Sequence, residues 1–239
     1  MRDAARANAA YRAAHAARSF PDPRLVFEVA GHPYLESFDQ SGAQHAARIA
    51  ALIKEGASPD ARVLEWGCGP ARILAHLPAL LPEARFYGCD PDERGITFAQ
   101  IAHPNVEFRA IATMPPTPYE DHSFDIIYGI SVLTHLSETN AHAWSAELTR
   151  LISPDGSVFL TSHGDAAAAV SLDAEARRKY DAGAYTTAAG AREGSRTFAS
   201  YFNQDCGREL FARKFADVHF WPAGESGFGQ DLWKLRGAL

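Results

Sequence analysis

Short apolar segments alternate with helical patterns between residues 62 and 163, and this alternation constrains the fold more than any other feature. Ser41 is expected to cap the first helix, and Pro78 to end or kink the second. Alternating strands and helices favour a parallel sheet with helices on both faces. The predicted strands are 62–66, 84–90, 105–111, 124–130 and 157–163, and the predicted helices are 41–54, 71–81, 92–102 and 137–152.

The two ends of the chain differ from this central pattern. Residues 1–40 are predicted as an N-terminal helical extension or cap, and its alanine-rich start indicates a plain helix more than a transit peptide. The remaining 41–239 form the main domain. Residues 164–203 have weak periodicity and are predicted to be an insertion or lid. A helix is then predicted over 204–215. The two strands predicted after it, 216–223 and 231–237, form a late β-hairpin.

Charge and cysteine content exclude several classes of protein. The formal charge of −6 and the absence of a basic stripe argue against nucleic acid as a partner. No apolar run approaches the roughly 20 residues that cross a bilayer. The 3 cysteines are widely separated and have no zinc-site spacing, so we expect no metal and a cytoplasmic location.

The first strand ends in an unusual way, in the stretch VLEWGCGPAR at 63–72. Glu65 lies at the end of an apolar strand, and Gly67 and Gly69 follow it. Ligands of open α/β sheets bind at the carboxyl ends of the strands, where glycines let the backbone approach closely. The alternative is a glycine turn that only joins strand to helix.

Asp90 ends the second strand and favours a ligand site over a simple glycine turn. A carboxylate at this position can accept both hydroxyls of a ribose, as in sites for adenosine-containing cofactors. Asp90 could instead cap the helix that starts near Asp92. A dinucleotide fingerprint would need glycine or alanine at position 72, and Arg72 opposes the close packing which that residue serves. The cofactor is therefore not expected to be a nicotinamide dinucleotide.

In these motifs the chain resembles the class I S-adenosylmethionine-dependent methyltransferases, in particular bacterial small-molecule enzymes. Glu65, Gly67 and Gly69 stand where that family has its first motif. Other resembling stretches are FYGCDPD, PPTPYEDHSFDIIYGISVLTHLSE at 115–138, ELTRLISPDGSVFLTSHG at 147–164 and GQDLWKLRG at 229–237. The resemblance implies a Rossmann-like fold: a doubly wound, seven-stranded, mostly parallel sheet. Its last strand would lie antiparallel between the fifth and sixth.

The resemblance also implies which residues would hold S-adenosylmethionine, whose product is S-adenosylhomocysteine. Gly67, Cys68 and Gly69 would lie under the methionine part, with Glu65 ordering its amino group and Ser131 approaching through its backbone. Asp90 would hold the ribose, and Pro91 would shape the adenine side. The family often has an acid or Asn after the third strand, where this chain has Ala112 and Thr113, so backbone and apolar contacts are expected to hold adenine.

Two histidines are the candidates for acid–base chemistry. A general base is needed only when the methyl acceptor must lose a proton. His135 follows the fourth strand, His163 ends the fifth, and the ordinary pKa of histidine, about 6.5, suits that task. Either could instead have a structural role. Aromatic candidates for acceptor contacts are Tyr34, Phe38, Tyr185 and Tyr201, for which simple packing is the alternative.

The sequence therefore predicts methyl transfer to an oxygen or nitrogen of a small molecule. Two alternatives stay open: an intramolecular displacement on the same cofactor, and a non-catalytic protein that binds the cofactor or interacts with a partner. Whether the chain forms a homodimer is also open.

Overall fold

Seven strands of the chain form one sheet. The computed structural model describes residues 2–188 and 192–239, and in them the sheet order is β3-β2-β1-β4-β5-β9-β8. The strands are β1 (Arg62–Trp66), β2 (Arg85–Asp90), β3 (Glu107–Ala110), β4 (Phe124–Gly129), β5 (Ile152–Ser162), β8 (Phe215–Trp221) and β9 (Asp231–Ala238). The pairs β1–β4, β2–β3 and β4–β5 are parallel. This is the doubly wound order that the resemblance implied, and its parallel pairs agree with the alternation of strands and helices.

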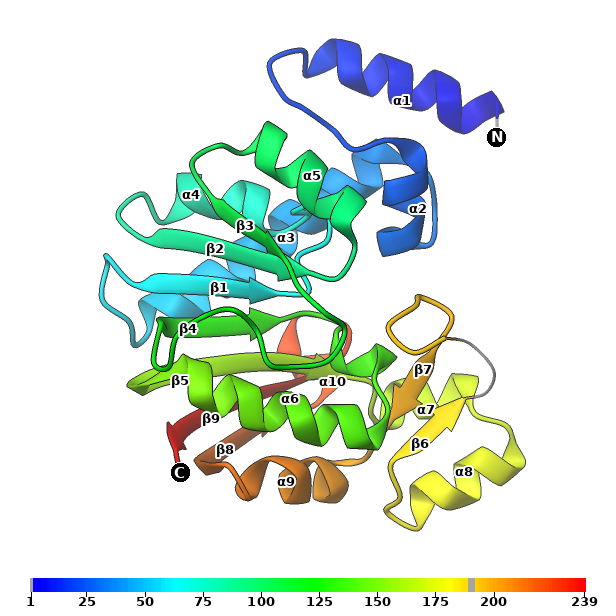
Figure 1. Cartoon of the computed structure of the whole chain (residues 1–239). Helices are drawn as coiled ribbons and strands as arrows, with labels where there is room; N and C mark the ends of the chain where they lie inside the picture. Colours follow the sequence, from blue (N-terminus) through cyan, green and yellow to red (C-terminus); the bar gives the residue numbers. More distant parts are fainter. Residues whose placement is uncertain (1, 189–191) are drawn as a thin grey trace. The chain divides into compact units, whose positions relative to one another are not determined.

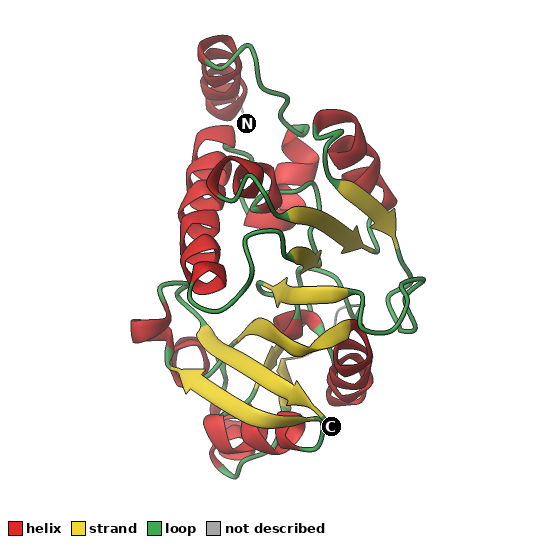
Figure 2. Cartoon of the chain, turned by 90° about the vertical axis from the view of Figure 1, so that its left-hand side faces the viewer, coloured by secondary structure: helices red, strands yellow, loops and turns green. Residues whose placement is uncertain are grey.

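The last strand accounts for the mixed character of the sheet. β9 pairs antiparallel with both β5 and β8, and Figure 2 shows the β8–β9 pair that ends at the C-terminus. Leu232, Trp233 and Leu235 of β9 are fully buried, as expected for a strand with neighbours on both sides. The predicted fold class and the predicted place of the last strand are confirmed.

The chain divides into two compact units, and the first comprises residues up to Asp60 together with Gly67–Ile111. Besides β2 and β3 it contains α1 (Arg2–Ala14), α2 (Pro23–Ala30), α3 (Leu35–Lys54), α4 (Leu77–Leu80) and α5 (Glu93–Ala102). The carboxylate of Asp39 on α3 accepts hydrogen bonds from Tyr11 at 2.8 Å and from Arg18 at 2.7 and 2.5 Å. This half-buried ion pair with Arg18 and the hydrogen bond from Tyr11 tie the N-terminal segment to α3.

Two helix predictions in this unit were wrong. The helix predicted from residue 41 begins at Leu35, so the boundary at 40/41 falls inside it, and Ser41 donates to Phe38 O within the helix instead of capping it. The helix predicted over 71–81 is broken into a 3-10 turn at Leu74–His76 and the short α4, in which Pro78 is near the start. Proline lacks the N–H that a continuous helix would need there.

The second unit comprises Ala61–Trp66 and the chain from Ala112 onward. It contains β1, β4, β5, β8 and β9, the 3-10 helix η2 (Leu133–His135), α6 (Glu138–Leu151), α9 (Gln204–Ala212) and α10 (Ala223–Ser226). The predicted insertion has its own elements: α7 (Asp165–Ser171), α8 (Ala174–Asp181), and the antiparallel pair β6 (Thr186–Ala188) and β7 (Ala199–Tyr201). Figure 1 shows them beside the N-terminal end of α6. Positions 189–191 of the insertion lie outside the described residues.

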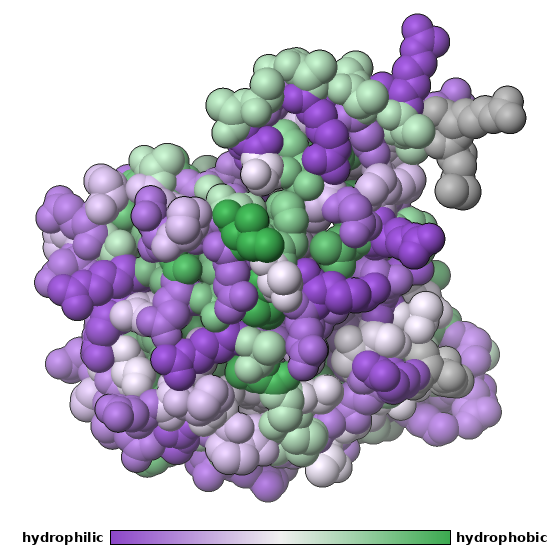
Figure 3. Space-filling view, turned by 45° about the horizontal axis from the view of Figure 1, so that its top comes forward, coloured by the Kyte–Doolittle hydropathy of each residue, from purple (hydrophilic) through white to green (hydrophobic). Residues whose placement is uncertain are grey.

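The described helices include none that is both long and apolar enough to cross a membrane. The alanine-rich start of the chain forms α1, as predicted. In the space-filling view its part of the surface mixes pale green with purple, in keeping with a helix of alanine and arginine (Figure 3).

Candidate active site

The glycine loop after β1 has a backbone that few other residues could adopt. Gly67 and Gly69 have φ angles of 77° and 50°, in the left-handed region that favours glycine. The amides of Gly67 and Cys68 both donate to the carbonyl of Cys89 in β2, at 2.8 and 3.1 Å. The loop is therefore fixed to the end of β2 by its own backbone.

Asp90 binds the same loop through its side chain. One carboxylate oxygen accepts from the amide of Gly69 at 2.8 Å and the other from the amide of Asp92 at 2.7 Å. Burial raises the pKa of Asp90, and these two hydrogen bonds oppose that rise. The cap of α5 is Asp92, whose carboxylate accepts from Arg94 N. Each oxygen of Asp90 can accept a further bond, so both hydrogen bonds are compatible with a ligand.

Helices of the first unit pack tightly on this loop. A Cβ placed on Gly95 of α5 would lie 3.0 Å from the carbonyl carbon of Gly69, closer than side chains normally approach. A Cβ on Gly69 would lie 3.4 Å from Val29 Cγ2 of α2. Pro91 is exposed at the end of β2. The loop thus has little freedom to move, which is how a preformed binding site is built.

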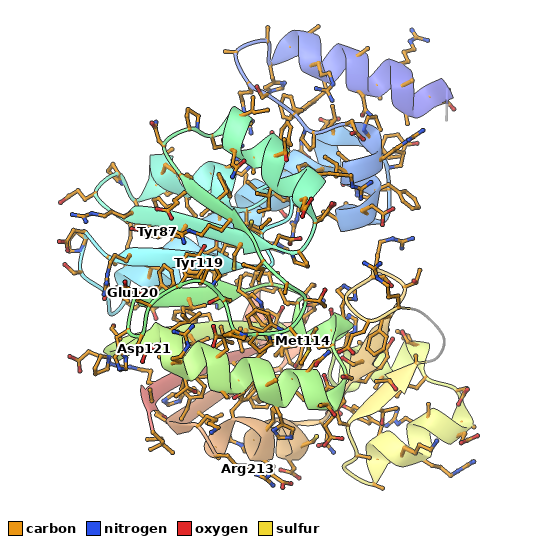
Figure 4. The ribbon with its side chains drawn as sticks, in the orientation of Figure 1. Tyr87, Met114, Tyr119, Glu120, Asp121 and Arg213 are labelled. Atoms are coloured by element: carbon orange, nitrogen blue, oxygen red, sulfur yellow. The ribbon has the colours of Figure 1, made fainter. Side chains whose placement is uncertain are left out.

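In the second unit, the segment after β3 is held by an indole. Ala112 and Thr113 are exposed, and Trp144 Nε1 of α6 donates to Thr113 O at 3.0 Å. Figure 4 labels Met114 at the carboxyl end of the strands of this unit, and Glu120 and Asp121 at their amino end. These two acids therefore lie far from the edge where ligands bind in such folds.

Ser131, just after β4, is held by a closed ring of hydrogen bonds. Its amide donates to Thr161 Oγ1 at 2.8 Å, that hydroxyl donates to Gln230 Oε1 at 2.6 Å, and Gln230 Nε2 donates to Ser131 Oγ at 2.6 Å. Ser131 has a φ of 62°, which is uncommon for a residue other than glycine. The ring holds this strained backbone at the carboxyl end of β4.

His135 ends η2 and has one defined partner. Its Nδ1 lies 2.7 Å from the carbonyl oxygen of Phe198, so Nδ1 must carry the hydrogen. Burial lowers the pKa of His135, the Phe198 carbonyl raises it in part, and Arg196 lowers it further. Within the described residues Nε2 makes no hydrogen bond. This neutral ring therefore offers a lone pair at Nε2.

His163 follows β5 in a different environment. Its ring stacks on Tyr201 with centroids 5.1 Å apart, and its buried Nδ1 has no partner within the described residues. Burial, and after it the charge of His135, lower its pKa to about 4, against an opposing hydrogen bond to the Ser200 backbone. His163 is neutral at physiological pH and a weaker base than an ordinary histidine.

Comparisons with known proteins agree with this geometry. Residues 63–156 match the family model of a methyltransferase domain. An uncharacterized methyltransferase of Schizosaccharomyces pombe is 31% identical over 108 residues, which are 41% of this chain and 38% of that protein. The match thus spans well under half of the relative's length.

Solved structures extend the agreement beyond the family match. A TehB-like SAM-dependent methyltransferase of Corynebacterium glutamicum superposes with a TM-score of 0.54 at 17% identity, over 81% of this chain and 87% of that one. Human N-acetylserotonin methyltransferase in complex with SAM gives a TM-score of 0.56 at 12% identity, over 82% and 52% of the two chains. Residues 63–156 therefore form a methyltransferase domain, and the chain has the fold of S-adenosylmethionine-dependent methyltransferases. The methyltransferase domain and the fold predicted from the motifs are confirmed.

The aromatic candidates lie in different environments. Tyr34 is 44% exposed, whereas Phe38 lies in a buried cluster with Val26 and Leu35, which supports a packing role. Tyr201 is buried under His163. The hydroxyl of Tyr185 donates to Leu136 O at 3.0 Å, a contact within the protein.

Glu65 is 3% exposed and lies in β1 opposite Tyr128. Sequence reasoning missed Thr161, Gln230 and Ser200, which form hydrogen bonds with the segment after β4. No local motif marks them, because their partners are far away in the chain.

Among the described residues no group of three or more His, Cys, Asp or Glu side chains could hold a metal ion.

Proposed function

We propose that the chain transfers a methyl group from S-adenosylmethionine to an oxygen or nitrogen of a small molecule. The observation that carries this proposal is the glycine loop at positive φ, bound to the carboxylate of Asp90. A loop without side chains beside a strand-end acid fits the methionine and ribose parts of that cofactor.

The residues of the first unit fit this cofactor well. Gly67, Cys68 and Gly69 would line its methionine part, while Asp90 would accept from the ribose hydroxyls and Pro91 would border adenine. Glu65, Ala112, Thr113 and Ser131 stay predicted contacts. When bound, the cofactor supplies a methyl carbon on a positively charged sulfur, which is already activated toward a nucleophile. The protein then has to orient the acceptor and take up its proton.

His135 is the proton acceptor in this proposal. Its Nδ1–H is engaged by Phe198 O, so Nε2 has the lone pair. The lowered pKa makes His135 a weaker base than an ordinary histidine, as it does His163, but it keeps the ring neutral and able to accept a proton. The buried Nδ1 of His163 and its pKa of about 4 make that residue the weaker candidate.

The acceptor class rests on the absence of a basic stripe and on aromatic side chains such as Tyr34. Cytoplasmic location, the absence of nucleic-acid and membrane partners, and the oligomeric state stay predictions. Intramolecular displacement on the cofactor and binding without turnover remain the alternatives.

Calorimetric titration with S-adenosylmethionine and S-adenosylhomocysteine tests the cofactor. We expect micromolar binding by the wild type and loss of binding by Gly67→Arg, which forces a side chain into the left-handed region. Gly56→Arg is the matched control, because a Cβ at Gly56 meets nothing within 4 Å. A folded wild type that binds neither compound contradicts the proposal. Release of S-adenosylhomocysteine in an acceptor screen then separates methyl transfer from binding without turnover.

A further inference from the structure

The insertion forms hydrogen bonds with one short segment of the second unit, which consists of η2 and the residues after it. Gly194 N donates to His135 O at 2.9 Å, and Ser137 N donates to Glu193 Oε1 at 2.5 Å. The carbonyls at the end of a helical turn have no partner inside the turn, and such groups need partners elsewhere. The insertion supplies these partners.

Two hydroxyl groups add to this attachment. Ser200 Oγ of β7 donates to Leu133 O at 2.8 Å, and the bond is fully buried. The hydroxyl of Tyr185, which precedes β6, donates to Leu136 O at 3.0 Å. The ring of Tyr185 stacks on Phe202, with centroids 5.1 Å apart, so its hydroxyl is held in place. The backbone on both sides of His135 is therefore fixed by the insertion.

The same element also selects the proton position on the ring. A neutral histidine can carry its hydrogen on either nitrogen, and the partner of one nitrogen decides the state of the other. Phe198 O, two residues before Ser200, accepts from Nδ1 at 2.7 Å. A carbonyl can only accept, so this contact excludes the tautomer with hydrogen on Nε2.

We propose that the insertion is a positioning element for His135: Phe198 O sets its tautomer, and Ser200 and Tyr185 hold the turn that presents Nε2. This inference rests on the proposed function, in which Nε2 takes the acceptor's proton. During that transfer the proton goes from the acceptor's oxygen or nitrogen to Nε2, while the hydrogen on Nδ1 stays on its bond to Phe198 O. Ser200 and Tyr185 touch neither acceptor nor cofactor in this role.

Nitrogen NMR of protein labelled with ¹⁵N-histidine tests the tautomer without any ligand. The chain has 10 histidines, and His135→Gln identifies the signals of this one. In the wild type above pH 7 we expect hydrogen on Nδ1 and none on Nε2. In the double variant Ser200→Ala/Tyr185→Phe we expect loss of the Nδ1–H signal, because the ring is no longer held against Phe198 O.

A matched control removes two hydroxyls of the same insertion that do not reach η2. Tyr180 donates to Asp165 and Thr186 donates to Ala184, so Tyr180→Phe/Thr186→Val should keep the wild-type signals. Hydrogen on Nε2 in the wild type overturns the proposal, as does an unchanged tautomer in the double variant or equal loss in the control. If the double variant does not fold, each single variant is measured, and the wild-type result stands by itself.

Steady-state kinetics with an acceptor found in the screen provide a second test of the positioning role. Because general base catalysis contributes about 10²–10⁴-fold, a loosened base should lower kcat about tenfold and leave KM within about twofold. An unchanged kcat overturns the positioning role. Failure of cofactor binding in the calorimetry would overturn the proposed function whatever the tautomer, whereas binding with the other tautomer overturns this inference alone.

Discussion

The segments that follow β1 and β4 are held in different ways. The glycine loop after β1 is bound by Asp90, which is 21 residues away in the chain. The segment after β4 is bound by Phe198 at a separation of 63 residues and by Gln230 at 99 residues. One segment is built from its neighbouring strand, and the other depends on an insertion and on the last hairpin.

This difference separates two tasks of the proposed reaction. A common cofactor needs a fixed loop, and a strand–helix–strand unit supplies its partner at a constant spacing. An acceptor that differs from enzyme to enzyme is better served by a segment whose support comes from an insertion outside the large sheet, since loops placed on a rigid scaffold can change without loss of the fold. The following predictions test whether the two segments can be disturbed independently.

The largest expected effect is on turnover. His135→Gln should lower turnover by about 10²–10⁴-fold, because the ring that accepts the proton is lost. Cofactor affinity should stay within about twofold, as measured by calorimetry, because the glycine loop does not depend on His135. His142→Gln on α6 is the control and should keep wild-type turnover. Full activity of His135→Gln would show that the acceptor needs no base at this position.

The second effect is on cofactor affinity. Asp90→Ala should weaken S-adenosylmethionine binding by about 100-fold, since it removes a charged acceptor that is worth roughly 1.5–3 kcal/mol per hydrogen bond. It also leaves the amides of Gly69 and Asp92 without their partner. Asp92→Ala removes the cap of α5 and an exposed ion pair with Arg94, and it should cost about 1 kcal/mol of stability with little change in affinity. Similar affinities of the two variants would contradict the role of Asp90.

The third effect is on stability and belongs to the segment after β4. Gln230→Ala opens the hydrogen-bonded ring at Ser131 and leaves the buried Thr161 hydroxyl without an acceptor. Denaturant unfolding should show a loss of about 1–3 kcal/mol. Gln40→Ala removes an exposed pair with Glu36 and should stay within about 0.5 kcal/mol. A neutral Gln230→Ala would mean that the ring contributes little to the fold.

The smallest effect is a change in the pH dependence of stability. Burial raises the pKa of Asp231 from 3.8 to about 6; the Ala223 amide opposes this rise and Asp165 adds to it. Between about pH 4 and about pH 6 the folded state holds a proton that the unfolded state has lost. The free energy of unfolding therefore falls as the pH rises through this window. Above about pH 6 the decrease caused by Asp231 is complete and remains.

Asp231→Asn removes this titration. The variant should be more stable than the wild type by about 1–2 kcal/mol at pH 7 and equal to it near pH 4. Thermal unfolding at both pH values measures the difference, with Asp217→Asn, on the exposed part of β8, as the control. A wild type whose stability rises between pH 4 and pH 6 more steeply than that of the variant would contradict the raised pKa.

Local patterns located the strands of the large sheet, but β5 begins at Ile152 and not at the predicted residue 157, and the two short strands of the insertion were not predicted. β1 begins and ends where the apolar run predicted, and Asp90 lies at the end of β2 as expected. The helix predicted over 71–81 is interrupted next to Pro78, as that proline predicted, but its first turn is also missing, because apolar spacing does not register the left-handed φ of 62° at Ala71. The start of α3 was placed too late, since Tyr34 carries no capping side chain to mark it.

The sequence by itself determined the fold, the methyltransferase domain and the elements that carry the glycine loop. These depend on strand and helix periods and on residues within one strand–helix–strand unit. Only the tertiary structure decided which nitrogen of His135 carries hydrogen, that Phe38 is packed in a core, and that Gln230 supports Ser131. The physical reason is that a hydrogen bond between groups 63 or 99 residues apart depends on how the sheet and the insertion bring them together.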